Sequence, residues 1–400
     1  MAEKRPYYIV TLLMDANLAV ALVALPLFAT AQLGSSAFEL GLIGAIGALT
    51  YVLASPLWSH IAPRFGRRKF ILASGIGFAL TYLLVAHSTQ VWHLFILSGC
   101  SGMSCALFYP LVEGEIGAGA TGSVLRRRVG YFCLAWSTGS TIGFLLGGRL
   151  YDLAVRLPFI SCAFGGLTVA IITYFFIPSP LKLAQDGARG QGPGMGEASG
   201  GAAILDSAQP KADVLLTPGV FLWLAYIANF TAWGLFSILR DLYARPALLR
   251  FGYSGTQFGI LISGFCLART LTFFILQRWE GWHYEKRPFY LLQLVMLAGG
   301  AIIVLSGNFL LTLFAFMLVG LGAGMIYYSS MLYSLDDPRT EGKRAGFHEA
   351  ILGAGGALSL TIAGRMPALT GRMMSPFVFG AALIAAGLLV QMTLSLKRRR

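Results

Sequence analysis

The sequence is short of charge. Only 12% of its 400 residues are Asp, Glu, Lys or Arg, whereas a soluble domain carries about a quarter. Hydrophobic residues make up 56%, and they gather in blocks of about 20, the length that an α-helix needs to cross the hydrocarbon core of a bilayer. This composition predicts an integral membrane protein that is surrounded by lipid.

Several chemical patterns are also missing. None of the five cysteines forms a CxxC pair, so we expect neither a metal site nor a disulfide framework. The sequence has no nucleophile–base set and no nucleotide-binding loop, which argues against an enzyme, a cofactor and an ATP-driven pump. Short alternating segments typical of a membrane β-barrel are absent as well. The chain is therefore predicted to be all-α.

The apolar blocks give the number of spans. We predict twelve transmembrane helices, and the even number places both termini on the same side. The blocks are 8–32, 38–60, 70–88, 91–113, 129–150, 157–178, 217–240, 255–277, 288–307, 309–334, 345–366 and 376–396.

The basic residues set the orientation. A formal net charge of +13 invites a nucleic-acid partner, but most Lys and Arg lie in every second connection, as in Arg64–Lys69 and Arg126–Arg128. An excess of Lys and Arg marks cytoplasmic loops. We therefore expect no nucleic-acid binding, cytoplasmic N- and C-termini, and a multi-pass protein of the plasma (inner) membrane.

One stretch breaks the apolar pattern. Residues 179–216 are rich in Gly, Ser and Pro, a composition that cannot bury enough apolar surface to fold. We predict a flexible cytoplasmic linker there. It separates an N-terminal six-helix half, residues 1–178, from a C-terminal six-helix half, residues 217–400.

A ladder of small residues occurs once in each half, and each member of the second copy follows its mate by 216 positions. Small residues at this spacing let helix backbones approach closely in lipid, and two copies predict two pseudo-symmetric halves, as in transporters built from repeats. The ladder comprises Gly130, Gly139, Gly143, Gly147 and Gly148, and then Gly346, Gly355, Ser359, Ala363 and Gly364. We expect these residues where the two halves meet or slide.

The connection after the second block carries Arg64, Gly66, Arg67 and Arg68 in the order Arg-x-Gly-Arg-Arg. This resembles the loop 2–3 signature of the major facilitator superfamily, Gly-x-Leu-x-Asp-Arg-x-Gly-Arg-Arg/Lys. The usual Asp is Pro63 here. In the family that acid helps to lock the outward-open state, so the cluster is expected to act as a cytoplasmic gate loop that pairs with Glu113 or Glu115. The alternative is a basic cluster that only sets topology.

Two further sequence fragments resemble motifs of particular groups within that family. The first ladder resembles the span 5 motif of drug:proton antiporters, although Phe144 stands where that motif has Pro. Asp15 followed by Ala24, Leu25 and Pro26 is similar to a span 1 motif of multidrug exporters, with a longer separation. The resemblance implies the major facilitator fold and alternating access between two halves.

Ionisable residues inside spans are costly in lipid and normally face a cavity or a partner. Asp15, Glu113, Arg269 and Glu349 are the candidates, and His348 lies beside the last. At ~1.5 Å per residue, Asp15, Arg269 and Glu349 lie roughly 8–13 Å from the inner ends of their helices. We predict a switchable ion pair between Arg269 and one of these two acids, with a permanent structural pair as the alternative.

The resemblance also implies that spans 1, 4, 7 and 10 line the central path. Substrate-cavity candidates are Asn17, Tyr109, Asn229, Trp233, Tyr327 and Tyr328, together with Trp136 beside the ladder. A mainly apolar wall with a few polar groups suits an amphipathic or aromatic small molecule. No acid is firmly placed at mid-depth, which argues against a strongly cationic substrate.

The sequence thus predicts a monomeric secondary active transporter that exports a small organic molecule in exchange for protons. The first alternative is uptake of a metabolite, which would be anionic if Arg269 is its counter-charge. The second is a membrane sensor or scaffold that transports nothing.

Overall fold

The computed structural model describes residues 4–120, 122–177, 218–279, 281–335 and 341–397. The predicted linker, residues 179–216, lies outside them. Every regular element in the described part of the chain is helical. Most helix ends lie within about five residues of the predicted blocks, but the fifth span begins already at Gly122, and the predicted block 91–113 is interrupted after Ala106.

The N-terminal half contains seven helices that make six spans, because α4 and α5 form one interrupted span. They are α1 (Arg5–Ala31), α2 (Ala37–Phe65), α3 (Arg67–Val85), α4 (Val91–Ala106), α5 (Tyr109–Gly117), α6 (Gly122–Leu153) and α7 (Leu157–Phe176).

The C-terminal half repeats this arrangement, with α9 and the short α10 in one apolar segment. Its helices are α9 (Pro218–Leu242), α10 (Ala244–Leu249), α11 (Gly255–Arg278), α12 (Lys286–Leu305), α13 (Phe309–Leu335), α14 (Glu341–Thr370) and α15 (Ser375–Lys397). Eleven described segments are long and apolar enough to cross a membrane. The helix outside that set is α14, which packs between α2 and α9 and completes twelve spans.

The break between α4 and α5 has a local cause. Pro110 lies in the first turn of α5 and has no N–H to donate to the preceding turn. The chain therefore turns at Leu107 and Phe108 before the helix resumes. As a result, Tyr109 and Glu113 lie one turn apart on the same face of α5.

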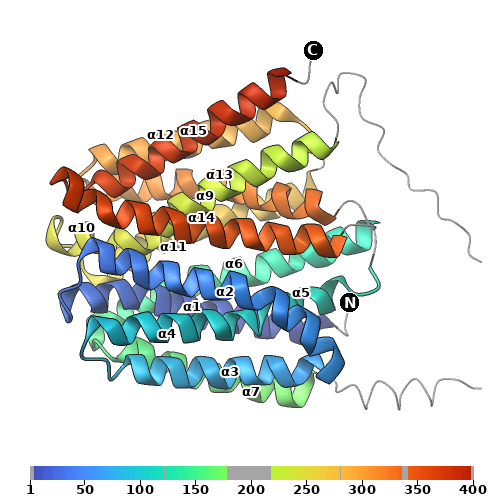
Figure 1. Cartoon of the computed structure of the whole chain (residues 1–400), viewed down its shortest axis with the longest axis horizontal. Helices are drawn as coiled ribbons and strands as arrows, with labels where there is room; N and C mark the ends of the chain where they lie inside the picture. The colour runs from blue at the N-terminus through green and yellow to red at the C-terminus, as the bar shows by residue number, and fades with distance from the viewer. Residues whose placement is uncertain (1–3, 121, 178–217, 280, 336–340, 398–400) are drawn as a thin grey trace, which may run out of the picture.

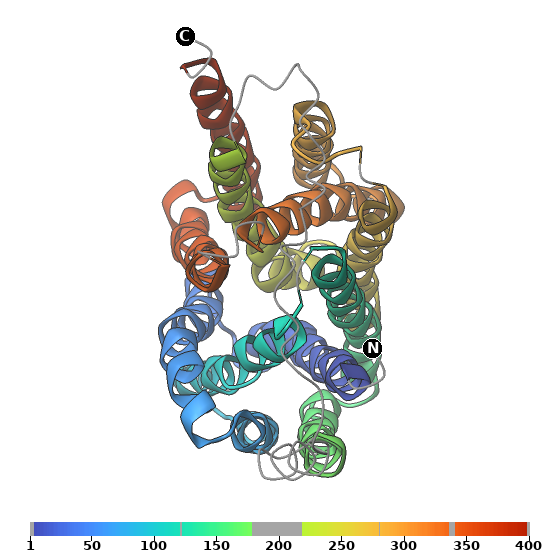
Figure 2. The same ribbon diagram turned by 90° about the vertical axis from the view of Figure 1, so that its right-hand side faces the viewer.

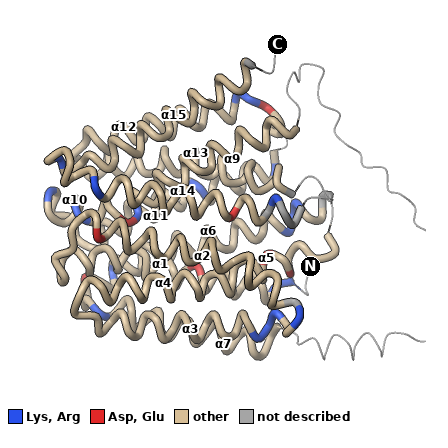
Figure 3. The backbone as a smooth tube through the Cα atoms, in the orientation of Figure 1, with Lys and Arg blue, Asp and Glu red and all other residues tan. Residues whose placement is uncertain are grey.

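The two halves lie side by side with their helices roughly along one direction (Figure 1). The start of α1 and the end of α15 lie at one end of the bundle, which we call the terminal end; the opposite end, near α10, is the far end. Helix α15 diverges from the N-terminal half towards the terminal end. Seen from that end, the halves are two separate groups of helices (Figure 2). Lys and Arg gather mainly at the terminal end (Figure 3).

The glycine ladder packs differently from the prediction. A Cβ on Gly139 or Gly143 would meet the backbone of α1 at Leu12 or Ala16, and one on Gly355 would meet Phe230 of α9. These contacts lie inside one half. The middle of the ladder therefore joins the first and fifth spans of each half, and the expectation that it lies where the halves meet is wrong for these positions.

The last ladder position in each copy does join the halves. A Cβ on Gly148 would strike the backbone of Gly255 in α11, and one on Gly364 would lie 2.8 Å from the carbonyl oxygen of Ala37 at the start of α2. Gly259 faces Gly148 in the same way that Gly41 faces Gly364. The two interfaces are thus α6 with α11 and α14 with α2, related by the pseudo-symmetry.

The first rung of the ladder is not symmetric. Gly130 faces the side chain of Gln277 in α11, whereas Gly346 has no atom near its Cβ position among the described residues. The duplication therefore holds for the close-packed part of the ladder and fails at the terminal end.

Helices α2 and α11, which face the last ladder positions, begin with matching caps. Ser36 and Glu39 form a capping box at α2, and Ser254 and Gln257 form one at α11. Each box satisfies backbone N–H groups that a helix start leaves without partners. The equivalent positions of these caps confirm the pseudo-symmetry independently of the glycines.

Polar contacts also tie the halves together at the far end. The Asp152 carboxylate of α6 accepts hydrogen bonds from the N–H groups of Gly255 (2.8 Å) and Thr256 (2.7 Å) and from the Thr256 hydroxyl (2.5 Å). Arg245 beyond α9 donates to the carbonyl oxygen of Ser35 at 2.6 Å. A carboxylate at a helix N-terminus is stabilised by the helix dipole. The far end is therefore closed.

Candidate functional site

A cavity of about 240 Å³ lies between the halves. Helices of both halves line it, including α1, α2, α5 and α6 on one side and α9, α13 and α14 on the other. Its walls are mostly apolar and aromatic, with a small set of charged groups. This is the usual composition of a small-molecule site.

Three of the predicted ionisable residues meet in this cavity. Asp15 of α1, Glu113 of α5 and Glu349 of α14 all line it. The sequence placed no acid firmly at mid-depth, whereas the structure brings these three acids to the wall of one cavity. Helix ends alone could not show it, because the break at Pro110 and the tight packing of α1 on α6 decide where these side chains point.

The glycine ladder positions Asp15. Gly139 and Gly143 allow the backbone of α1 to lie directly on α6, and the Ser140 hydroxyl then donates to Asp15 Oδ1 at 3.3 Å. Asp15 Oδ2 is buried and has no hydrogen-bond partner among the described residues. A carboxyl group held in this way can take a proton or a cationic ligand group.

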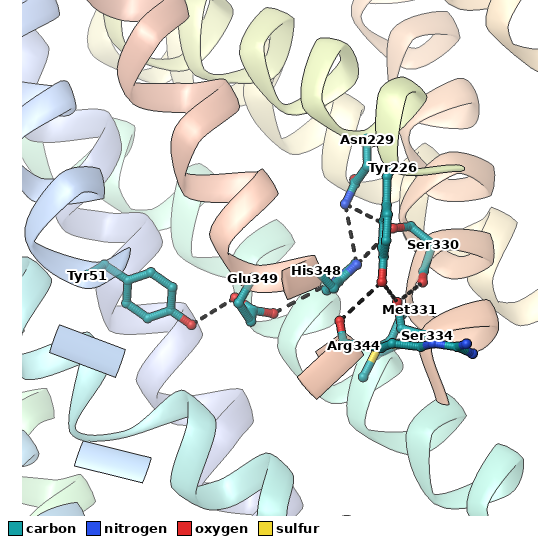
Figure 4. A network of polar contacts seen from close by, with 10 residues as sticks. Tyr51, Tyr226, Asn229, Ser330, Met331, Ser334, Arg344, His348 and Glu349 are labelled. Carbon is teal, nitrogen blue, oxygen red and sulfur yellow. Dashed lines mark hydrogen bonds and ion pairs between the residues drawn. The ribbon is translucent and has the colours of Figure 1, made fainter. Parts of the chain in front are cut away.

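Glu349 connects the two halves across the cavity (Figure 4). The hydroxyl of Tyr51 on α2 donates to Glu349 Oε2 at 2.9 Å. On the other side, Oε1 lies 3.9 Å from Nε2 of His348. Glu349 is therefore the predicted acid that contacts both halves directly.

His348 is buried and anchored in the C-terminal half. Its Nδ1 lies 2.9 Å from the Ser330 hydroxyl and 3.4 Å from the Asn229 amide, and its ring packs edge-on against Tyr327. These contacts fix the ring so that Nε2 is directed towards Glu349 (Figure 4). His348 therefore lies behind Glu349, away from the cavity, and its Nε2 makes no hydrogen bond among the described residues.

The cavity wall contains a further charged pair that the sequence does not predict. Arg240 donates to its neighbour Asp241 through Nε and Nη2, both at 2.6 Å, and both residues line the cavity. Asp241 fits there because Gly44 of α2 has no side chain. Arg240 lies near the end of α9, which made it look like an ordinary loop charge.

The predicted substrate-cavity residues divide into two groups. Tyr109, Trp136, Trp233 and Tyr327 line the cavity, and Trp136 and Tyr327 are in edge-to-face contact at 5.2 Å. The remaining three lie elsewhere: Asn17 faces Gly165 of α7, Asn229 lies in the network behind Glu349, and Tyr328 packs edge-to-face against Trp282.

Arg269 forms no ion pair with Asp15 or Glu349 in this structure. It is 2% exposed, its guanidinium lies 4.2 Å from the centre of the Trp136 ring, and its Nε donates to Ser137 at 3.1 Å. Stacking on an aromatic face makes burial of the cation tolerable. Arg269 therefore packs behind Trp136, a residue of the cavity wall. The switchable ion pair of Arg269 with an acid stays a prediction about other conformational states of the protein.

The basic loop between α2 and α3 pairs within its own half. Gly66 adopts a φ of 93° at the junction, and Arg67 donates to Glu115 at 2.6 Å. Lys4 lies 3.7 Å from the same carboxylate. Of the two partners expected for this cluster, Glu115 takes the role and Glu113 faces the cavity instead.

No group of three or more His, Cys, Asp or Glu in the described segments could hold a metal ion. The structure thus combines two helical halves, a cavity between them and carboxylates inside the spans.

The family model described as the Major Facilitator Superfamily matches residues 7–359. The chain belongs to the major facilitator superfamily. Among solved structures, it superposes on the bacterial homologue of the human lysosomal transporter Spinster, in an inward-facing and occupied conformation, with a TM-score of 0.72, 14% identity and coverage of 99% and 97% of the two chains. The nucleoside transporter NupG gives a TM-score of 0.68 at 13% identity over 98% and 99%.

Curated superfamily relatives match over shorter stretches. The class H tetracycline resistance protein of Pasteurella multocida is 31% identical over 153 residues, which is 37% of each chain. Multidrug resistance protein 1 of Bacillus subtilis (strain 168) is 26% identical over 255 residues, 62% of this chain and 61% of that protein. The chain thus covers between about a third and three fifths of these relatives.

Proposed function

We propose that this superfamily member is a secondary active transporter that exports a small aromatic or amphipathic molecule in exchange for protons. The observation that carries the proposal is the cavity between the halves, whose aromatic walls hold the carboxylates of Asp15, Glu113 and Glu349. Alternating access requires a site that both halves share. The resistance proteins that match parts of the chain agree with export.

The charges in the cavity favour a cationic substrate. The Arg240 guanidinium is already engaged by Asp241, which leaves three acids on the walls without a basic partner there. Aromatic rings such as Trp136 and Trp233 attract cations through their faces. A flat cation of moderate size therefore complements both the shape and the charge of the site.

Glu349 suits the coupling step. As an anion it accepts a charge-assisted hydrogen bond from Tyr51, roughly twice as strong as a neutral one. A proton or a cationic substrate competes for the same carboxylate and weakens this link between α2 and α14. Asp15 offers a second carboxyl group on the N-terminal side.

The orientation follows from the basic residues. With the terminal end at the cytoplasm, as the excess of Lys and Arg there favours, the closed far end faces outwards. The structure then represents an inward-facing or occluded state. Opening to the outside requires the Asp152 and Gly148 contacts to break.

Uptake of an anionic metabolite has less support. Its proposed counter-charge, Arg269, stacks on Trp136 behind the cavity wall, and the cavity itself is rich in acids. A sensor or scaffold that moves nothing predicts no flux at all. These three functions therefore predict different results in a single transport experiment.

The test uses protein reconstituted in liposomes with an acidic interior. We expect accumulation of ethidium, a planar aromatic cation, by the correctly oriented fraction of the protein, and no accumulation of fluorescein, an aromatic anion. Glu349→Gln should abolish proton-driven accumulation, whereas Glu285→Gln, which removes an exposed carboxylate at the start of α12, should not. Preference for the anion would favour the uptake alternative, and absence of flux across a broad compound panel would favour the scaffold.

A further inference from the structure

A second cavity, of about 360 Å³, lies at the terminal end between α6 and α11. It is built from both halves and is lined by basic side chains: Arg126 and Arg127 from α6, Arg278 from the end of α11, and His283 from the following turn. Among the described residues, its lining contains no Asp or Glu. Its charge is thus opposite to that of the central cavity.

The asymmetric first rung of the glycine ladder shapes this cavity. Gly130 has no side chain, so the Gln277 amide lies against the backbone of α6. Gln277 is itself a lining residue and brings a polar amide between the arginines of the two halves. Gly346, the mate of Gly130, has no described atom within 4 Å of its Cβ position, so the two interfaces between the halves differ at this level.

Among the described residues, two of the guanidinium groups make only long hydrogen bonds, and that of Arg278 also lies 3.6 Å from the centre of the Phe274 ring. Arg127 reaches the Tyr131 hydroxyl at 3.4 Å, and Arg278 reaches the carbonyl oxygen of Phe274 at 3.5 Å. Good N–H···O bonds measure about 2.7–3.2 Å. Arg127 and Arg278 are also exposed, so both can turn their donors towards a ligand in the cavity.

The loop between α2 and α3 holds another basic cluster, and an acid lies within it. There Arg67 contacts Glu115 at 2.6 Å and Lys4 contacts it at 3.7 Å. Basic residues at the terminal end are expected from topology alone. A cavity that gathers them from two halves, with no acid in its lining, requires a further reason.

An apolar stripe leads away from the cavity along α11. Leu267, Leu271 and Phe274 are exposed and follow one another at helical spacing up to Arg278. At ~1.5 Å per residue, the distance from Leu267 to Arg278 is roughly 16 Å, about half of the ~30 Å hydrocarbon thickness of a bilayer. An acyl chain in one leaflet matches this stripe while its headgroup reaches the arginines.

We propose that this cavity binds the phosphodiester headgroup of an anionic phospholipid, with an acyl chain along α11. Guanidinium groups bind phosphate oxygens through paired, charge-assisted hydrogen bonds, and basic pockets between membrane helices suit such headgroups. Because Arg127 and Arg278 belong to different halves, the lipid bridges them near the cytoplasmic surface. This bridge is separate from the substrate site and does not depend on what the protein transports.

The lipid is tested on detergent-purified full-length protein by thermal unfolding and by native mass spectrometry. Phosphatidylglycerol should raise the unfolding temperature and remain bound, whereas phosphatidylcholine and inorganic phosphate should do neither. Removal of two basic contacts by Arg127→Gln with Arg278→Gln should raise the phosphatidylglycerol concentration needed by about 30-fold, at about tenfold per 1.4 kcal/mol and roughly 1 kcal/mol per basic residue.

Two control variants keep the result decisive. Arg64→Gln with Lys69→Gln removes two exposed charges from the same end of the bundle and should leave lipid binding unchanged. Arg127→Lys with Arg278→Lys keeps the charge and should retain most of the binding even if the glutamine variant folds poorly. Equal loss in the glutamine and control variants would overturn the site in favour of general surface attraction. Equal stabilisation by inorganic phosphate would show that the cavity binds a free anion and not a lipid headgroup.

Discussion

Replacement of Gly148 by alanine tests whether close backbone contact closes the far end. The new Cβ would strike the carbonyl oxygen of Gly255 and lie 2.9 Å from its carbonyl carbon and 3.1 Å from Cα of Gly259. Favourable carbon–carbon contacts are about 3.5–4.0 Å long, so α6 and α11 must separate locally by roughly 0.5–1 Å. The clashing atoms are backbone atoms and cannot rotate away.

The expected effect is a shift between states. Overpacking typically costs about 1–3 kcal/mol, which lowers the population of the closed far end about 5- to 150-fold relative to an open one. Spin labels at Leu153 and Leu369, which are exposed on different halves, should report a longer distance. The labels need a background without reactive cysteine, because Cys100 is exposed.

Two matched variants define the comparison. Gly364→Ala should act like Gly148→Ala, because its Cβ would lie 3.1 Å from Cα of Phe38 in the other half. Gly143→Ala should instead lower thermal stability without opening the far end, because Gly143 packs on α1 of its own half. An unchanged label distance and normal transport in Gly148→Ala would refute the assignment of this contact to gating.

Three further predictions concern polar groups. Asp152→Ala removes the acceptor of the Gly255 and Thr256 N–H groups, and because loss of a capping side chain costs about 0.5–2 kcal/mol the far end should open about 2- to 30-fold more often, read by the same labels; an unchanged distance would show that this cap does not contribute to the gate. Arg269→Lys keeps the charge but loses the planar stack on Trp136, so the unfolding temperature should fall. Transport should not recover when Arg269→Ala is combined with Asp15→Asn, and recovery would establish the ion pair predicted from the sequence. Tyr51→Phe should reduce coupled transport while His348→Gln, which keeps polar atoms beside Ser330, retains more of it; equal loss would contradict their different roles.

Much of the fold follows from the sequence because the bilayer restricts the solutions. A span must satisfy its own backbone hydrogen bonds, so long apolar blocks become helices with ends close to those predicted. The ladder predicted duplication correctly because close approach of helices in lipid requires small residues. Repeated capping boxes at Ser36 and Ser254 carry the same signal, although they are less visible in the sequence.

The site was harder to predict because it depends on which way each helix face turns. Asp15, Glu113 and Glu349 were recognised as costly in lipid, but the cavity that joins them arises from the packing of α1 on α6 and the break at Pro110. Arg240 and Asp241 were missed because their place near a helix end suggested solvent. The partner of Arg269 was expected to be an acid, whereas an aromatic ring also stabilises a buried cation.

The central claim is that the two halves alternately expose the cavity on opposite sides. Paired distance measurements test it most directly, with labels at Leu153 and Leu369 for the far end and at Phe65 and Leu396 for the terminal end; all four side chains are exposed. Changes of pH in the presence and absence of ethidium should lengthen one distance while the other shortens. Distances that change together, or that stay fixed at both ends while flux continues, would contradict alternating access.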